Sequence, residues 1–339
     1  MSVFSIKPPS FNKTEIKKIV YDLFGLRVDV KNLDSDRDQN FYLYTISNEE
    51  FVLKIYNSNE SIDIINLQTN VLDHFQKNDS EVITAPKIIK TTDGNFLGIV
   101  KKNDIEYFLR LVSFIKGKQL KDIDQKSISF YGLGSFIGII NKVLDTFTDP
   151  NAKRKLPWDV GNIDFLNKRF NIINDKKKRE VISYFINQYN INILPNNKLL
   201  RKSIIHNDFN DHNIIVDNDN KIFGIIDFGD MVYTYTAAEP AVAIAYAVLG
   251  RRNPIKIAGE ILKGYCHTNF LSNDELKSII YFTCIRLCIS VTMAEYRSKL
   301  FPNNKYLMVS NVDAWEFLTA IYKENLTAWS EKMVKYAKK

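Results

Sequence analysis

Two short groups of polar residues, at 206–213 and 227–230, contain the side chains most suited to chemistry. The first reads HNDFNDHN, so Asp208 is followed five positions later by Asn213, and the second reads DFGD and begins with Asp227. Each group borders an apolar, β-branched run of the kind that forms strands, and the turn DNDN separates two such runs. Strands joined in this way fold back on each other, so we expect the oxygens of the two groups to meet.

Phosphoryl transfer requires this set of side chains. One carboxylate accepts or orients the proton of the attacking hydroxyl, and an amide oxygen and a second carboxylate hold Mg²⁺ on the phosphates. Asp208 is therefore the candidate base, and Asn213 and Asp227 are the candidate metal ligands. A polar hairpin closed by Asx turns is the alternative, and we disfavour it.

The order H-x-D-x-x-x-x-N followed by D-F-G resembles the aminoglycoside phosphotransferase and choline kinase family of small-molecule kinases. Protein kinases normally carry Arg in the first motif, where this chain has Asn207. Four segments are similar to the hydroxylysine kinase branch of the family: NDFNDHNIIV, DFGDMVYT, EPAVAIAYAVLG and RLCISVTMAEYR…PNNKYLMVSNVDAW. These segments are spread over the C-terminal two-thirds of the chain.

The resemblance implies an α+β, bilobal, protein-kinase-like fold. A small antiparallel-sheet lobe at 1–115 would bind the nucleotide, and a mainly helical lobe at 116–339 would carry the catalytic loop, the metal loop and the acceptor site. In the first lobe we expect a helix from Thr14, its N-cap, to Gly25, then strands in LRVDVKNL, NFYLYTI and FVLKIYN. Further helices are expected at 59–76, 127–147, 164–174, 177–190, 235–249, 254–265, 272–300 and 310–335, and further strands within 86–100 and 105–115.

Lys54 lies in the apolar strand segment FVLKI, where alternation places it on one face with Val52 and Tyr56. A strand lysine in this setting suits the residue that binds the α- and β-phosphates in kinases, although a lone lysine is more often an edge-strand residue. The loop before it, 34–40, has three aspartates and no glycine. It would repel a triphosphate unless those aspartates face away.

The resemblance implies further nucleotide contacts in the first lobe. Asn40 would be a phosphate-loop residue, and Gln68 would take the place of the helix Glu that pairs with the strand lysine, with Glu60 as the alternative. The segment LVSFIKG, which includes Val112 and Phe114, resembles the hinge whose backbone reads the purine edge. Backbone readout does not distinguish ATP from GTP.

The acceptor is inferred from the remaining polar residues of the second lobe. Asp211, Asp230 and Glu239 are carboxylates beyond those the metal needs, and they would pair with an ammonium group. Trp158 is either a packing residue or a residue near the opening of the substrate site. Arg286, inside an apolar helix, holds a substrate carboxylate or forms an internal salt bridge with a buried acid.

Bulk properties exclude several other classes of protein. The net charge is +7, but the densest basic run, 176–179, is short, so we expect a solvated helix face and no nucleic-acid partner. We see no apolar run near the roughly 20 residues of a membrane span and no secretory signal in MSVFSIKPPSFNK. Three cysteines suit a cytoplasmic protein, and Cys284 and Cys288 are expected in the core rather than on zinc.

Three hypotheses follow. The favoured one is a kinase that transfers the γ-phosphate of ATP or GTP, with Mg²⁺, to an amino alcohol or hydroxy amino acid; the resemblance implies a 5-hydroxylysine-like acceptor. The second is an aminoglycoside, homoserine, choline or ethanolamine kinase on the same fold. The third is a catalytically silent nucleotide-binding module. The oligomeric state does not follow from the sequence.

Overall fold

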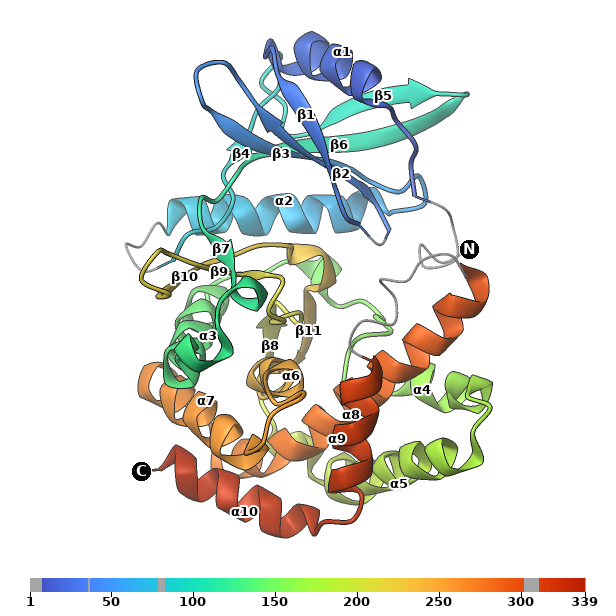
Figure 1. Cartoon of the computed structure of the whole chain (residues 1–339), viewed down its shortest axis with the longest axis vertical. Coiled ribbons are helices and arrows are strands. Elements are labelled where there is room, and N and C mark those ends of the chain that lie inside the picture. Colours follow the sequence, from blue (N-terminus) through green and yellow to red (C-terminus); the bar gives the residue numbers. More distant parts are fainter. Residues whose placement is uncertain (1–7, 36, 79–82, 302–310, 339) are drawn as a thin grey trace. The chain divides into compact units, whose positions relative to one another are not determined.

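A computed structural model of the chain describes residues 8–35, 37–78, 83–301 and 311–338 (Figure 1). Contacts between Cα atoms divide the chain into two compact units, Met1–Lys116 and Gly117–Lys339. Three segments considered above lie wholly or partly outside the described residues: the N-terminal MSVFSIK, Asp36 of the polar loop, and PNNKYLMVS of the fourth similar segment. The division of nucleotide binding and catalysis between the units stays a prediction.

The first unit is built on a six-stranded antiparallel sheet. Its order is β1-β2-β3-β6-β4, and β5 pairs with the first half of β6. The strands are β1 (Asp29–Leu33), β2 (Gln39–Tyr44), β3 (Glu50–Ile55), β4 (Ile88–Ile89), β5 (Gly98–Lys102) and β6 (Ile105–Ser113). The predicted alternation in β3 is confirmed, because Phe51, Leu53 and Ile55 are buried while Val52 and Lys54 occupy the other face.

A helix covers each face of this sheet (Figure 1). The apolar face packs against α1 (Lys13–Phe24) through Ile16, Val20 and Phe24. The expectation that Thr14 caps α1 is wrong. Asn12 is the cap, because its Oδ1 accepts from Glu15 N at 3.0 Å while Glu15 Oε2 accepts from Asn12 N at 2.7 Å. Gly25, with φ of 68°, ends the helix as predicted.

The opposite face of the sheet carries the polar residues and packs against α2 (Ile62–Lys77). Arg110, on β6 directly opposite Lys54, is buried and donates from Nη2 to Ile65 O at 2.6 Å and to Thr69 Oγ1 at 2.6 Å. These bonds fix the helix to the strand. The sheet face that holds Lys54 is therefore positioned by a buried guanidinium that sequence analysis did not identify.

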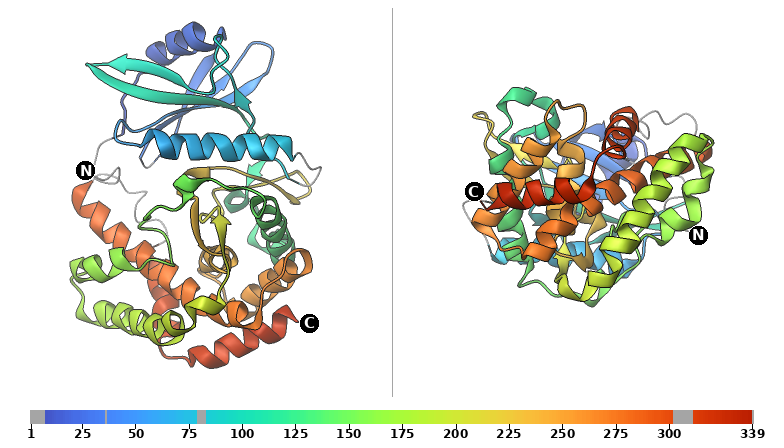
Figure 2. Two further views of the ribbon diagram at one scale, coloured as in Figure 1. Left: turned by 180° about the vertical axis from the view of Figure 1, so that it is seen from behind. Right: turned by 90° about the horizontal axis from the view of Figure 1, so that it is seen from below.

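The second unit is mainly helical, as expected (Figure 2). Its helices are α3 (Phe130–Leu144), α4 (Asp164–Arg169), α5 (Lys176–Asn192), α6 (Ala238–Ala247), α7 (Pro254–Thr268), α8 (Asn273–Leu300), α9 (Asn311–Ile321) and α10 (Leu326–Ala337). The single helix expected at 310–335 is wrong. Asn325 interrupts it and caps α10, its Oδ1 accepting from Ala328 N at 3.1 Å.

Helix α8 is the central helix of the second unit and packs against α5, α6, α9 and α10. By length and composition it could cross a membrane, contrary to the expectation that no segment approaches that length, and it is the only such helix in the described part of the chain. Its apolar window is 89% buried, as in the core helix of a folded unit. Cys284 and Cys288 lie in this core, as predicted.

Two small sheets carry the polar loops. Strand β8 (Lys202–Ile205) pairs antiparallel with β11 (Val232–Tyr235), and β9 (Ile214–Val216) pairs antiparallel with β10 (Ile222–Ile225) and β7 (Lys118–Gln119). The strands predicted on either side of the turn DNDN are thus confirmed. The helix expected from residue 235 starts later, because Val232–Tyr235 is a strand.

Candidate active site

The strand pairing brings the two polar loops together. Ile226 N donates to Asn213 O at 2.9 Å, just beyond the β9–β10 ladder, so Asn213 and Asp227 lie at the same end of that hairpin. In the second small sheet, Ile205 at the end of β8 pairs with Val232 at the start of β11. The catalytic loop, residues 206–213, therefore lies beside the metal loop, residues 227–231.

Direct bonds connect the two loops. His206 Nε2 lies 3.1 Å from Ile226 O, and Asn207 Nδ2 donates to Asp230 O at 3.2 Å. Burial lowers the pKa of His206 to about 4, so the ring is neutral near pH 7. The residues Asn207 and Asp227 both have left-handed backbones, with φ of 64° and 60°. Such conformations are costly for residues other than glycine and occur often at functional sites.

Asp208, the predicted base, has partners on both carboxylate oxygens. Oδ2 accepts from Asn213 Nδ2 at 2.7 Å, and Oδ1 lies 2.9 Å from Arg286 Nη2. Burial raises the pKa of Asp208 to about 6, and Arg286 opposes that rise. The negative charges of Asp230 and Asp227 add to it. The carboxyl is thus mostly ionised at neutral pH and close to the range in which a general base works best.

Arg286 forms an internal salt bridge, the second of the two roles considered for it. Its side chain is 1% exposed, and besides Asp208 it donates from Nη1 to Trp158 O at 2.8 Å and from Nε to Tyr246 OH at 3.1 Å. The guanidinium also lies 4.7 Å from the centre of the Trp158 ring. In this structure Trp158 positions Arg286, and the carboxylate that Arg286 binds is that of Asp208, the protein's own.

Glu239 was expected to meet the acceptor, and the structure contradicts this. Its side chain is fully buried on α6, and its two oxygens accept from His206 N at 2.6 Å and Asn207 N at 2.8 Å. Burial raises the pKa of Glu239 to about 8, against the effect of these two donors. Both carboxylate oxygens of Glu239 thus bind backbone N–H groups, so Glu239 anchors the backbone of the catalytic loop.

The candidate metal ligands fit Mg²⁺ by their chemistry. Since Asn213 Nδ2 donates to Asp208 O and Oδ2, the amide orientation is fixed and Oδ1 is the atom left for a ligand. Asp227 supplies a carboxylate, one oxygen of which accepts from Gly229 N at 3.2 Å. These are the hard oxygen donors that Mg²⁺ prefers beside phosphates. Among the described residues, no three His, Cys, Asp or Glu side chains form a metal site of their own.

Arg154 positions the metal loop and was missed in the sequence. Its Nη2 donates to Gly229 O at 2.6 Å and its Nε to Met231 O at 2.9 Å. An arginine in an irregular segment carries no periodic signal, and its partners lie more than 70 residues away.

Of the remaining predicted residues, Asp230 is buried in the metal loop, whereas the Asp211 side chain is 53% exposed.

In the first unit, Lys54 Nζ lies 3.0 Å from Asp38 Oδ2. Asp38 is buried, and its Oδ1 accepts from Asn57 N at 2.9 Å. Gln68 does not hydrogen-bond to Lys54 in the described structure. It accepts from Tyr56 OH at 3.2 Å. The expected pairing with Gln68 is therefore wrong. Asp38 of the polar loop is a partner of the lysine, a role that sequence analysis did not assign to it.

The other predicted nucleotide contacts lie on the same sheet. Asn40 is directly opposite Lys54, and its Oδ1 is buried without a hydrogen-bond partner among the described residues. Val112 is opposite Val52, and Phe114 donates its backbone N–H to Glu50 O at 3.0 Å while its ring packs 5.0 Å from Tyr42. The roles of these residues in nucleotide binding stay predictions.

Comparison with known proteins identifies the family. The phosphotransferase enzyme family matches residues 29–276, which is most of the chain and includes both polar loops and Lys54. The chain belongs to this family. This phosphotransferase is 26% identical to a hydroxylysine kinase of Mus musculus, with 97% of this chain and 94% of the relative covered.

Solved structures show the fold of this phosphotransferase. An amicoumacin kinase in complex with AMP-PNP and Ca²⁺ matches with a TM-score of 0.70 at 15% identity, covering 94% of this chain and 95% of that chain. A microcompartment-associated aminopropanol kinase matches with a TM-score of 0.70 at 14% identity, covering 93% and 100%. The predicted α+β, protein-kinase-like fold is confirmed, and the enzyme transfers phosphate to an alcohol group.

Proposed function

We propose that this phosphotransferase is a small-molecule kinase that transfers the γ-phosphate of ATP or GTP to a hydroxyl of an amino alcohol or hydroxy amino acid. A compound like 5-hydroxylysine is the first candidate, because the mouse relative is a hydroxylysine kinase that aligns over nearly its whole length. The observation that carries the proposal is the geometry of Asp208, held between Arg286 and Asn213 beside the metal loop.

The roles of the residues follow from their contacts. Asp208 accepts the proton of the acceptor hydroxyl, because its carboxylate is ionised near neutral pH and is fixed in direction by two partners. Glu239 keeps the loop backbone in place, and Arg154 does the same for the metal loop. In the first unit, Lys54 steadies the phosphates of the nucleotide.

The metal ligands are Asn213, through Oδ1, and Asp227. When bound there, Mg²⁺ neutralises charge that develops on the transferred phosphate. The buried carboxylate of Asp230 and the left-handed backbone of Asp227 support a loop built to present oxygens. The proposal does not depend on which purine the donor carries.

An acceptor panel tests the proposal. Purified protein is incubated with ATP or GTP, Mg²⁺, and 5-hydroxylysine, homoserine, choline, ethanolamine, 1-amino-2-propanol or an aminoglycoside, and nucleoside diphosphate and phosphorylated product are measured. We expect transfer to hydroxylysine or a similar hydroxy amino acid. Activity confined to aminoglycosides or choline would overturn the acceptor class. Nucleotide binding without transfer to any acceptor would favour a silent nucleotide-binding module.

A pair of variants tests the catalytic role. Asp208→Ala should lower turnover by about 10²- to 10⁴-fold, the usual contribution of a positioned acid or base. Asp219→Ala is the matched control, because Asp219 lies exposed in the turn between β9 and β10. Wild-type turnover in Asp208→Ala would remove the proposed role.

A further inference from the structure

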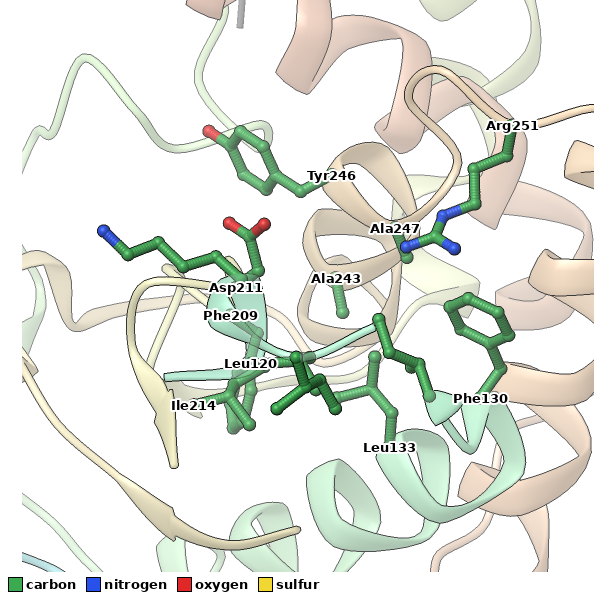
Figure 3. A pocket seen from close by; sticks show the side chains of 13 residues that line it. Leu120, Phe130, Leu133, Phe209, Asp211, Ile214, Ala243, Tyr246, Ala247 and Arg251 are labelled. Carbon is green, nitrogen blue, oxygen red and sulfur yellow. The ribbon is translucent and has the colours of Figure 1, made fainter. Parts of the chain in front are cut away.

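A group of contacts in the first unit joins the N-terminal segment, residues 8–12, to Gln39 at the start of β2. It is separate from the pocket in Figure 3, which belongs to the second unit and is lined in part by Phe209 of the catalytic loop. Gln39 directly follows Asp38 in the chain. The contacts of the N-terminal segment therefore end beside the residues predicted to bind phosphate.

Gln39 binds the backbone of Phe11 in both directions. Its Oε1 accepts from Phe11 N at 2.7 Å, and its Nε2 donates to Phe11 O at 2.9 Å. A side-chain amide that uses its acceptor and a donor on one residue has a single orientation. The two bonds thus fix the backbone around Gln39 relative to the N-terminal segment.

The N-terminal segment is itself firmly held. The Phe11 ring is 6% exposed and belongs to the apolar core of the first unit. It packs edge-on against Tyr107 of β6, with the ring centres 5.4 Å apart, and Lys102 Nζ lies 4.8 Å from its centre. Lys102 also donates to Ser10 O at 2.7 Å. The backbone to which Gln39 binds is therefore a fixed point of the unit.

Gln39 and Asn40 occupy opposite faces of the sheet, because side chains alternate along a strand. Gln39 pairs with Ile55, whose side chain is buried in the apolar core, whereas Asn40 pairs with Lys54. Just before them, Asp38 Oδ2 lies 3.0 Å from Lys54 Nζ. The backbone that carries Asp38 is thus anchored on the core face, while its carboxylate acts on the polar face.

Asn57 holds the same stretch of backbone at two further points. Its N–H donates to Asp38 Oδ1 at 2.9 Å, and its Nδ2 donates to Arg37 O at 3.2 Å. Residues 37–39 are thus bound at three successive positions, in a loop that contains no glycine. Since glycine is the residue that gives such loops their conformational freedom, this stretch is built to keep one conformation.

We propose that Gln39 is a positioning residue for the nucleotide, and that it acts through Asp38 on Lys54. The inference rests on the proposed function, in which Lys54 steadies the phosphates. Without the two bonds to Phe11, the stretch would populate conformations in which Asp38 lies away from Lys54. The observed affinity falls with the fraction of protein in the binding-competent conformation, so the nucleotide would bind less tightly.

The test measures dissociation constants of AMP-PNP and GMP-PNP with Mg²⁺ by calorimetry, without acceptor, and then KM and kcat with the preferred nucleotide. The whole chain is used. The variants are Gln39→Met and Gln39→Ala, each of which removes both bonds, alone and combined with Asp38→Asn. Lys102→Met is the matched control, because it removes bonds to Ser10 O and Glu15 at the same end of the chain and none to the polar loop. Thermal unfolding shows which variants fold.

We expect both Gln39 variants to weaken binding of the nucleotide analogue by about 3- to 10-fold, the effect of losing one or two hydrogen bonds. KM for the nucleotide should rise, with little change in kcat, and Lys102→Met should bind like wild type. In the Asp38→Asn background the Gln39 variants should have little further effect, because both changes act on the same contact. Unchanged binding in the Gln39 variants, an equal loss in Lys102→Met, or a full further loss in the Asp38→Asn background would overturn the inference.

The two proposals fail in different ways. Weaker nucleotide binding in the Gln39 variants, with no transfer by wild type to any acceptor, would support the role of Gln39 and overturn the proposed function. Transfer by wild type, with a KM for the nucleotide that Gln39→Met leaves unchanged, would do the reverse. A wild type that binds neither analogue would overturn both.

Discussion

Arg286 Nη2 lies 2.9 Å from Asp208 Oδ1, and the arginine is 1% exposed while the aspartate side chain is 19% exposed. The proposed base is thus held by a cation that approaches from the protein interior. The attractive charge limits the rise in the pKa of Asp208 that burial produces. The arrangement keeps the carboxylate ionised without exposing it fully to water.

Breaking this ion pair should lower the stability of the protein. Arg286→Met leaves Asp208 half-buried and removes the donors to Tyr246 OH and Trp158 O. Because removing one partner of a buried pair leaves the other without compensation, we expect a loss of about 3–5 kcal/mol in the free energy of unfolding. Urea denaturation measures this loss. We expect the double variant, Arg286→Met with Asp208→Asn, to lose less free energy of unfolding than the sum of the losses in the two single variants. Strictly additive losses would argue against an energetic coupling between Arg286 and Asp208.

Glu239 makes the stability of the protein depend on pH. The folded carboxyl keeps its proton to about pH 8, whereas in the unfolded chain it ionises near pH 4.5. Unfolding above pH 4.5 therefore releases a proton, and rising pH favours the unfolded state. Relative to Glu239→Gln, the wild type should lose a few kcal/mol in free energy of unfolding between pH 5 and pH 8.

Denaturation curves at several pH values measure this difference. Glu316→Gln is the control, because Glu316 is exposed on α9. Parallel pH dependences of the wild type and Glu239→Gln would show that Glu239 does not carry the effect. Glu239→Gln should also lower turnover at every pH, since an amide cannot accept from both His206 N and Asn207 N.

Asp38 should matter for nucleotide binding. Asp38→Asn keeps an oxygen for Asn57 N but removes the charge that lies 3.0 Å from Lys54 Nζ. The ammonium group of Lys54 would then be less well oriented toward the phosphates. We therefore expect KM for the nucleotide to rise by about 10-fold, with a smaller change in KM for the acceptor. Asp34→Asn, an exposed change in the same loop, is the control. An unchanged KM for the nucleotide would exclude this role of Asp38.

Gly134 allows two helices to pack closely. A Cβ at this position would lie 1.8 Å from Ile261 O of α7, so α3 and α7 would have to separate. Although alanine favours helix, Gly134→Ala should lower the free energy of unfolding by about 1–3 kcal/mol through overpacking. Lys142→Ala, exposed on the same helix, should change it little. A stabilised Gly134→Ala would contradict the close packing.

Local sequence patterns predicted the elements around the site well. The β-branched runs beside the two loops form β8, β9 and β10, because their alternation and their turn residues are local signals. The position of Asn213 next to Asp227 followed from the hairpin. These features depend on residues close together in the chain.

Contacts between distant residues could not be predicted in the same way. A glutamate in an apolar helix indicates a buried partner but does not show that Glu239 binds backbone N–H groups more than 30 residues earlier. Asp38 took the position beside Lys54 that was expected for Gln68, because the path of the loop, not residue type, decides which side chain reaches the lysine. Arg154 acts on carbonyl groups, which every residue has, so no motif marks its partners.

Asn207 has three roles at once. Its backbone has φ of 64°, its N–H binds Glu239, and its side chain donates to Asp230 O of the metal loop. Replacement by glycine would relax the backbone but remove the tether. Asn207 thus adds a side-chain link between the loops to the contacts at Ile226, and glycine at this position would keep the left-handed backbone without that link.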